Sequence, residues 1–414
     1  MKRSLLCLAA LIAVAYAQQS SRHPAPPAKP ALFAEIPAIE QGLSEITGLA
    51  FLHPVPYGTI TKEELRRYLD DRIRETTKDS ELKAEETALK LLGFVPPDFD
   101  LRQNTIDLLT EQAAAFYDYN KKRLFILEGA DDTAEEQVAL AHELAHALAD
   151  QHFHLNRYIH AGLDSDDASN ARQAVMEGQA SWLMAAYISK RGGGASNVPE
   201  SVLDMMTGSM GGSGGDYPVL DQAPPYIRET LIFPYSDGMR FQDAVFRKMG
   251  RPSFAEVFRS PPVSTQQVMH PERYLDHMLP TIPRPPPIPD ARSFRKLGDG
   301  TLGELDIRIL LSQYAGKASA EALAPHLKGA SYDLREHKHD VFPIIAYAAT
   351  WDSPDSAQQY FALFRKVLQG KWKRLDLTSE TPTRVEGHGD TGYFQVWIDG
   401  ATVSHREGWK TALH

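Results

Sequence analysis

Cysteine is almost absent from this chain of 414 residues, whose single cysteine is Cys7. Cys7 lies in an N-terminal segment that we expect to be removed after export. The mature chain would then carry no thiol and could form no disulfide bond. Any transition metal would have to be bound by histidine, aspartate or glutamate side chains.

Two further absences narrow the classes of partner. The chain has 44 Lys and Arg residues against 54 Asp and Glu, a net charge of -10, and no basic run typical of nucleic-acid binding. We therefore expect no nucleic-acid partner. Beyond the N-terminus no apolar run approaches the roughly 20 residues that span a bilayer. The mature chain is therefore expected to have no transmembrane segment.

The first 17 residues have the pattern of a signal peptide. Lys2 and Arg3 form its basic end, residues 4–14 are mostly apolar, and Ala15-Tyr16-Ala17 is a small-x-small cleavage site. The apolar stretch is too short to span a membrane. We expect cleavage after Ala17 and a periplasmic or secreted protein.

Composition divides the rest of the chain into four segments. Residues 18–60, which begin with a Pro/Ala/Ser-rich stretch, are expected to be a linker. Residues 61–280 are expected to be a mainly helical domain with a small β-sheet or hairpin. A Pro-rich linker (281–296) then leads to a smaller α+β domain (297–414). The predicted fold class is α+β.

Local patterns place the elements of the larger domain. Thr61 and Glu64 form a capping box that opens a helix, and residues 113–127 read as a β-hairpin whose turn spans 118–122. Thr133 opens another helix, expected to reach about residue 151. Further helices are expected at 79–93, 100–114, 167–189 and 237–249. The Gly/Ser/Met-rich residues 192–215 are expected to form a surface loop.

The C-terminal domain has weaker chemical signals. Helices are expected at 303–314 and 353–368, a strand at 341–351, and a hairpin at 392–406 with Asp399-Gly400 at its turn. The segment shows no catalytic constellation. Packing or the binding of a partner is therefore the role that we expect for it.

A pair of histidines on the helix after the hairpin points to metal chemistry. His142 and His146, in AHELAHALADQHFH (141–154), are four residues apart, so their imidazoles leave one helix face together. This spacing lets two nitrogens reach one zinc ion at about 2.0–2.1 Å. Glu143 lies one step round the helix, where a carboxylate can act as general base for a water activated by zinc.

A catalytic zinc site needs a third protein ligand and one open position. One candidate is Glu177, in AVMEGQASW (174–182) on the next helix. The other is His152, on the same segment as the first two ligands. On a continuous helix His152 would lie about 280° round from His142 and could not reach the metal. The run ALAD at 147–150 favours such a continuous helix, so the residues favour Glu177.

These motifs carry a resemblance. His142-Glu-Leu-Ala-His146 followed by Glu177-Gly-Gln-Ala resembles a gluzincin, the thermolysin-like class of zinc peptidases. The longer string HELAHALADQHF (142–153), with EGQAS downstream, resembles a group of bacterial zinc metallopeptidase-like proteins. This resemblance covers about residues 90–280. The resemblance implies that His142, His146 and Glu177 hold zinc and that Glu143 is the base. It also implies that an edge strand before the motif, in AFYDY or RLFIL, holds an extended peptide or protein substrate.

The sequence departs from the thermolysin-like pattern in one respect. The aspartate that orients the first histidine in that class stands four residues after the glutamate ligand, and here this position is Ser181. Asp150, four residues after His146, is one alternative source of such support.

A peptidase also needs a donor for the developing oxyanion. His270 and Tyr274, in MHPERY, have suitable side chains and helical spacing. Tyr235 and Tyr226 are alternatives to them.

Two classes of function follow. The first is an exported zinc-dependent metallohydrolase, expected to cleave peptide bonds, in which Glu143 takes a proton from the attacking water. A variant of it uses a metzincin-type site with His152 in place of Glu177. The second class is a non-proteolytic zinc protein whose C-terminal domain binds an envelope component. A site with three protein ligands and an intact Glu143 favours the first class, since a purely structural zinc site normally has four protein ligands.

Overall fold

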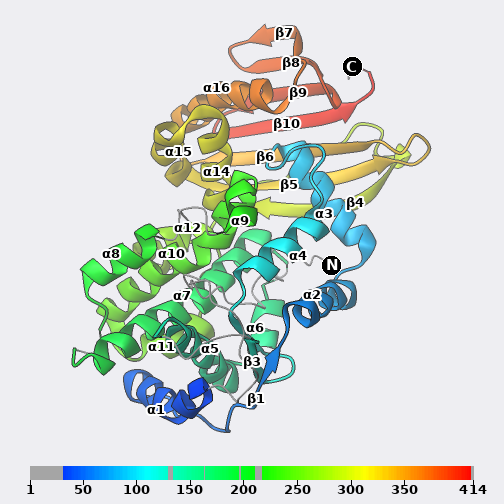
Figure 1. The fold of residues 1–414 in the computed structure, drawn as a ribbon. Coiled ribbons are helices and arrows are strands. Elements are labelled where there is room, and N and C mark those ends of the chain that lie inside the picture. The colour runs from blue at the N-terminus through cyan, green and yellow to red at the C-terminus, as the bar shows by residue number, and fades with distance from the viewer. Residues whose placement is uncertain (1–30, 129–133, 163, 195–196, 210–216, 412–414) are drawn as a thin grey trace.

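The computed structural model describes residues 31–128, 134–162, 164–194, 197–209 and 217–411. They form a mainly helical part with a three-stranded sheet and a C-terminal part built on a seven-stranded antiparallel sheet (Figure 1). The α+β class predicted from the sequence is confirmed. The predicted signal peptide lies outside the described residues.

The bounds of the elements are as follows. The helical part contains η2 (Ala31–Glu35), α1 (Ile36–Thr47), β1 (Tyr57–Ile60), α2 (Lys62–Thr76), α3 (Asp79–Leu92), α4 (Leu101–Gln112), β2 (Ala115–Asp118), β3 (Arg123–Leu127), α5 (Ala134–Phe153), α6 (Leu155–His160), α7 (Asp166–Arg191), α8 (Glu200–Ser209), α9 (Pro218–Gln222), α10 (Pro225–Met249), α11 (Ser253–Arg259), α12 (Thr265–Met269) and α13 (Pro271–Leu275). The C-terminal part contains η3 (Ala291–Ser293), β4 (Phe294–Leu302), α14 (Glu304–Ala315), α15 (Lys317–Leu323), η4 (Ala324–His326), β5 (Leu327–His337), β6 (Pro343–Trp351), α16 (Pro354–Lys371), β7 (Asp376–Thr381), β8 (Arg384–Gly389), β9 (Gly392–Asp399) and β10 (Thr402–Trp409).

Part of the segment expected to be a linker belongs to the fold. Helix α1 buries Ile39, Leu43 and Ile46 and packs against α5 and α7. Strand β1 joins the three-stranded sheet as the parallel neighbour of β3. The Pro/Ala-rich composition behind the expectation ends near residue 32, and the apolar residues of α1 recur at helical spacing after it.

The small sheet places one free strand edge beside the central helices. Its strand order is β1-β3-β2, so β2 has only one neighbour in the sheet. β2 and β3 form the predicted hairpin, with Phe116 opposite Phe125. All four residues of β2 are buried, and the strand packs against α5.

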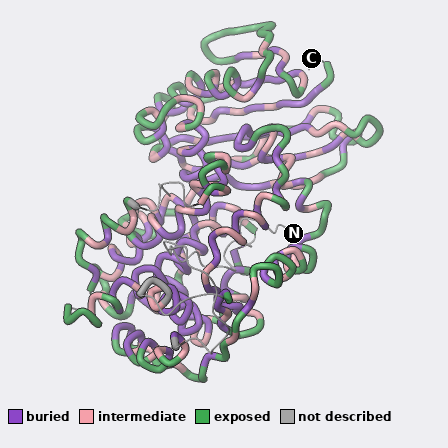
Figure 2. Tube along the Cα trace, viewed as in Figure 1, coloured by how far each residue is buried: buried purple, intermediate pink, exposed green. Residues whose placement is uncertain are grey.

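Helices α5, α7 and α10 form the centre of the helical part. Most of α7 is buried, including the fully enclosed Trp182, and Figure 2 shows continuous burial through the middle of these helices. Helix α10 begins at Pro225 and continues through Pro234, although the sequence predicted a helix only from about residue 237. The helix tolerates Pro234 because tertiary packing outweighs the one backbone hydrogen bond that proline removes.

The seven-stranded sheet has different cover on its two faces. Helix α16 lies on one face, where the hydroxyl groups of Tyr347 and Tyr360 are 3.0 Å apart. On the other face, the Pro-rich stretch before β4 runs across the sheet. Its Ile288 joins a small apolar cluster with Phe294, Ile344, Ala346, Tyr393 and Trp409. The residues predicted to link two domains are thus packed against the second one.

Two helix N-termini meet where the helical and C-terminal parts join. Asp167, in the first turn of α7, accepts hydrogen bonds from the backbone N–H and hydroxyl of Thr265. Asp306, in the first turn of α14, accepts from the N–H of Gly303 and the hydroxyl of Tyr226. Burial, together with neighbouring carboxylates, raises the pKa of Asp167 to about 6 and that of Asp306 to about 7.

The raised pKa values of Asp167 and Asp306 predict that the free energy of unfolding depends on pH. Because both pKa values are raised in the folded state, the contribution of these carboxyl groups is complete below about pH 4 and is lost as the pH rises through about 6 to 7. In the variant Asp306→Asn one of these groups no longer titrates. We expect the unfolding free energy of the wild type, minus that of the variant, to grow by on the order of 2 kcal/mol from pH 8 to pH 5.

Denaturant titrations of both proteins at each pH measure this difference. Histidines that titrate over the same range contribute equally to both proteins and cancel. The exposed Asp98→Asn is the matched control, for which we expect a constant difference. A constant difference for Asp306→Asn as well would contradict the effect assigned to the junction.

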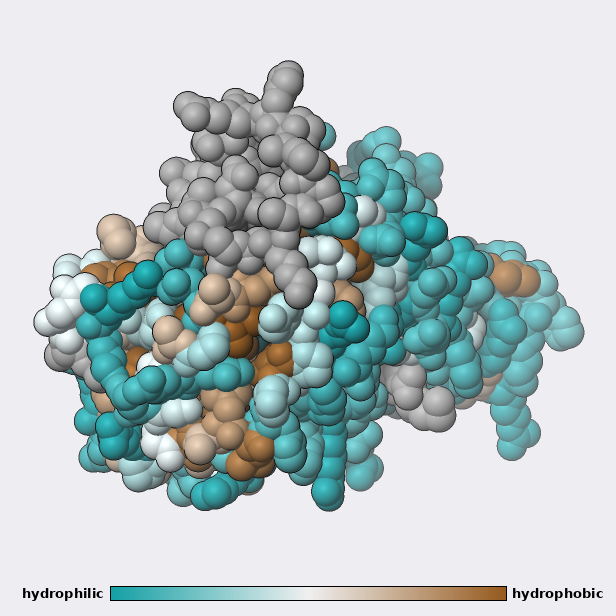
Figure 3. All heavy atoms as spheres, turned by 60° about the horizontal axis from the view of Figure 1, so that its bottom comes forward, coloured by the Kyte–Doolittle hydropathy of each residue, from teal (hydrophilic) through white to brown (hydrophobic). Residues whose placement is uncertain are grey.

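The surface is mixed in character. In Figure 3 apolar and polar side chains alternate over the helical part, whereas the projecting end of the C-terminal part is mostly hydrophilic. Within the described residues, no helix has both the length and the apolar character needed to cross a membrane.

Candidate metal site

Helix α5 supplies two of the site's side chains. His142 and His146 leave the helix on one face, as their spacing predicts, and both are buried. The helix continues through Phe153, which is consistent with the helix-forming run at 147–150.

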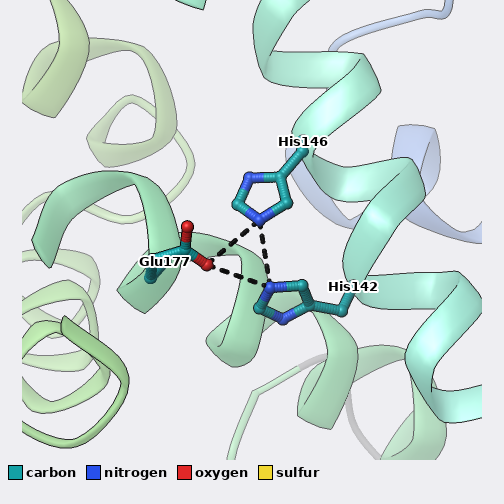
Figure 4. Close-up of side chains that lie close together, drawn as sticks. All are labelled: His142, His146 and Glu177. Carbon is teal, nitrogen blue, oxygen red and sulfur yellow. Dashed lines mark hydrogen bonds and ion pairs between the residues drawn. The ribbon is translucent and has the colours of Figure 1, made fainter. Parts of the chain in front are cut away.

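Helix α7 supplies the third side chain. Its first turn is capped by Ser165, whose hydroxyl accepts a hydrogen bond from the N–H of Ala168. Glu177 lies near the middle of the helix and is 1% exposed. Since α5 and α7 pack against each other, the carboxylate of Glu177 faces the two imidazoles (Figure 4).

The three ligand atoms form a nearly equilateral triangle. The distance between the two Nε2 atoms is 3.0 Å, and each of them is 3.2 Å from Oε2 of Glu177. Atoms bound at about 2.0–2.1 Å to one tetrahedral zinc ion lie about 3.3 Å apart. His142, His146 and Glu177 are the one group of His, Cys, Asp and Glu that could hold a metal among the described residues.

The charges of the three groups also fit a divalent cation. Burial lowers the pKa of His142, which keeps its ring neutral and able to bind a metal. Burial alone would raise the pKa of Glu177, but its interactions with His146 and His142 outweigh burial and lower that pKa to about 2. Oε1 of Glu177 is buried without a hydrogen-bond partner in the described structure, as expected for a carboxylate that binds a cation.

Glu143 lies beside this triangle with one oxygen held and the other unpaired. Its Oε2 accepts a hydrogen bond of 2.7 Å from the backbone N–H of Tyr117 in β2. Its Oε1 is buried and has no partner among the described residues. Burial and the charge of Glu177 raise the pKa of Glu143 well above its ordinary value. A carboxyl group with a raised pKa is suited to proton transfer near neutral pH.

Tyr117 connects the edge strand to α5 at a second point. Its hydroxyl donates to Asp150, which also accepts from Lys122 and from the N–H of Leu155. Glu143 and Asp150 are seven residues apart and therefore share a helix face. Asp150 was a candidate for supporting a histidine ligand, but the hydrogen bonds found for it are to these other groups. Nδ1 of His146 is buried without a hydrogen-bond partner in the described part of the chain.

His152 is held away from the triangle. Its Nε2 lies 2.8 Å from the carbonyl oxygen of Ala50, in the segment that follows α1. Of the two alternatives for a third ligand, the structure therefore brings Glu177 to the histidines. The metzincin-type arrangement has no geometric support.

The predicted oxyanion donors are engaged elsewhere. Nε2 of His270 lies 2.8 Å from Oε1 of Glu304, and the hydroxyl of Tyr274 donates to the carbonyl of Ser260. Tyr226 donates to Asp306 at the junction. Tyr235, named as an alternative, is buried, and its ring stacks 6.0 Å from that of His142. A catalytic role for His270 and Tyr274 stays a prediction.

Tyr117 is the residue of the site that sequence reasoning missed. Its hydrogen bond to Glu143 comes from the backbone, so no side-chain pattern marks it. The one available signal was its place in the strand-like run just before the helix.

The comparisons with known proteins assign this chain to no family. Models of known protein families, curated proteins and solved structures were all compared with this chain, and none matches it.

Proposed function

We propose that the chain is an exported zinc-dependent peptidase of the thermolysin-like type. The observation that carries this proposal is the triangle of His142, His146 and Glu177 with an unpaired carboxylate oxygen of Glu143 beside it. Three ligands leave one coordination place for solvent, which is the arrangement of catalytic rather than structural zinc. Export is proposed from the N-terminal signal pattern.

The zinc ion would polarise the substrate carbonyl and lower the pKa of water at the site toward 7. Glu143 would accept the proton of the attacking water at Oε1 and pass it to the leaving nitrogen. The N–H of Tyr117 fixes Oε2, so the carboxylate keeps Oε1 for this transfer. Tyr235, whose ring stacks on that of His142, is the proposed hydrogen-bond donor to the developing oxyanion.

The edge of β2 is the proposed place for an extended substrate. The N–H of Tyr117 points away from β3, because it donates to Glu143. In a strand the peptide groups of alternate residues point the same way, so those of Ala115 point to this side as well. Because the N–H of Tyr117 is bonded to Glu143, the peptide groups of Ala115 are the ones proposed to pair with a substrate. Main-chain pairing along such an edge accepts many sequences, which suits a peptide or protein substrate.

The test measures which peptides the chain cleaves in the presence and in the absence of zinc. The purified chain is incubated with a library of peptides, first as prepared, then after removal of metal by a chelator, and then after addition of zinc. We expect new peptide termini in the first and third conditions and none in the second. Bound zinc without cleavage in any condition would contradict the peptidase proposal and favour a non-proteolytic zinc protein.

A further inference from the structure

Helices α7 and α10 touch backbone to backbone next to the third metal ligand. A Cβ atom added to Gly178 would lie 2.1 Å from the carbonyl carbon of Gly238 and 2.2 Å from its oxygen. A Cβ atom added to Gly238 would lie 2.2 Å from the carbonyl oxygen of Ala174. No side chain larger than hydrogen fits at either glycine while the helices keep this distance.

The crossing lies at the metal site along both helices. Gly178 directly follows Glu177 on α7. On α10, Gly238 lies one turn after Tyr235, whose ring stacks on His142. One helix therefore contacts both sides of the ligand triangle, His142 through an aromatic ring and the Glu177 segment through its backbone.

Polar contacts hold the two helices together beyond the crossing. Nε2 of Gln179 donates to Oε1 of Gln242 and to the carbonyl of Phe254. Nε1 of Trp182 donates to Asp243 at 3.0 Å. The side chains of Gln179, Trp182, Gln242 and Asp243 all belong to α7 or α10 and are buried, so the pair resists sliding as well as separation.

We infer that the Gly178–Gly238 contact positions Glu177, and that it sets the distance between this carboxylate and the histidines of α5. The inference rests on the proposed zinc site and adds the residues that give the site its dimensions. Both glycines are positioning residues, since neither can bind a metal through a side chain.

The expected loss of zinc affinity follows from how precisely a zinc ligand must be placed. An alanine at either glycine forces the helices apart by about 1.3 Å to reach ordinary contact distance. Zinc–ligand bonds tolerate deviations of only about 0.2 Å. Rotation of the Glu177 side chain can recover part of this displacement. We therefore expect a loss of zinc affinity of about 10–100-fold, similar to the loss of other groups that orient a ligand.

The test compares Gly178→Ala and Gly238→Ala with a matched glycine. Gly208 lies in α8 with nothing within 4 Å of an added Cβ, so Gly208→Ala is the control. Zinc affinity is measured by competition with a chromophoric chelator, and ligand geometry by the visible spectrum of the Co²⁺ form. We expect weaker zinc binding and an altered Co²⁺ spectrum for the first two variants only. Unchanged affinity and spectrum in both would overturn the inference.

Two further variants separate positioning from folding. Trp182→Phe removes the hydrogen bond to Asp243 and should lower stability while leaving the Co²⁺ spectrum unchanged. Glu177→Asp removes one methylene, about 1.5 Å of reach, without disturbing the crossing. If the crossing is rigid, Glu177→Asp loses zinc about 10-fold or more. Zinc binding within about threefold of the wild type would show that α7 can shift, and would overturn the inference even if both alanine variants fail to fold.

Results that refute the proposed function can be distinguished from results that refute the positioning role of the two glycines. A wild-type chain that binds no zinc refutes the metal site and the inference together. A wild-type chain that binds zinc but cleaves nothing refutes only the peptidase proposal, and the comparison of glycine variants still holds.

Discussion

Replacing Glu143 by glutamine is expected to lower the rate of peptide hydrolysis by about 10²–10⁴-fold while zinc binding is retained. Glutamine has nearly the same shape and can still accept the hydrogen bond from the N–H of Tyr117. It cannot accept a proton from water, so it removes the general base and little else. The zinc ligands, on other side chains, are unchanged.

The measurement pairs turnover with metal content. Initial rates on a peptide cleaved by the wild type are compared with zinc content per chain for both proteins. Glu321→Gln, at an exposed position of α15, is the control for an uninvolved glutamate and should keep both properties. A Glu143→Gln protein with more than a tenth of the wild-type rate would contradict the assigned role of Glu143.

Glu177→Ala is expected to lower zinc affinity by at least about 100-fold, whereas His152→Ala leaves it within about threefold. Alanine at position 177 removes an ionised ligand and leaves two imidazoles, so the loss should exceed that of a group that only orients a ligand. His152 bonds to the carbonyl of Ala50, away from the site. Its loss should weaken that contact and leave the three metal ligands in place.

Equilibrium competition with a chelator measures both variants. His146→Ala serves as the reference for a lost histidine ligand and should resemble Glu177→Ala. The reverse pattern, with zinc lost from His152→Ala and kept by Glu177→Ala, would establish the metzincin-type site in place of the one described above.

Local sequence patterns predicted the helices that carry the metal site. The spacing of His142 and His146 is a property of one helix, and the run at 147–150 favoured a continuous helix through this segment, which the structure extends to Phe153. The choice of Glu177 followed from that continuation. The structure adds the distances among the three ligand atoms, which no local pattern contains.

Contacts between segments far apart in the chain could not be read from the sequence. The bond from Tyr117 to Glu143 uses a backbone group, and the approach of Gly178 to Gly238 depends on how two long helices cross. Glycine in a helix normally weakens it, so the pattern at 238 gave no hint of tight packing. The position of His270 at the junction likewise depends on α14.

Composition alone does not distinguish a folded segment from a linker or loop at two places in this chain. Residues 31–60 follow a Pro/Ala-rich stretch, yet α1 and β1 complete the helical core and the small sheet. Residues 192–215 are rich in glycine, serine and methionine, yet α8 occupies Glu200–Ser209. In both cases short amphipathic patterns gain stability from packing that composition cannot reveal.

The most direct test is the anomalous diffraction of zinc in crystals of the zinc-loaded chain, measured on both sides of the zinc absorption edge. We expect one strong peak bounded by Nε2 of His142, Nε2 of His146 and the carboxylate of Glu177, about 2.0–2.2 Å from each ligand atom. We also expect a solvent ligand in the fourth place, toward Oε1 of Glu143. A strong peak at other residues, or no peak between these three side chains, would contradict the proposed zinc site.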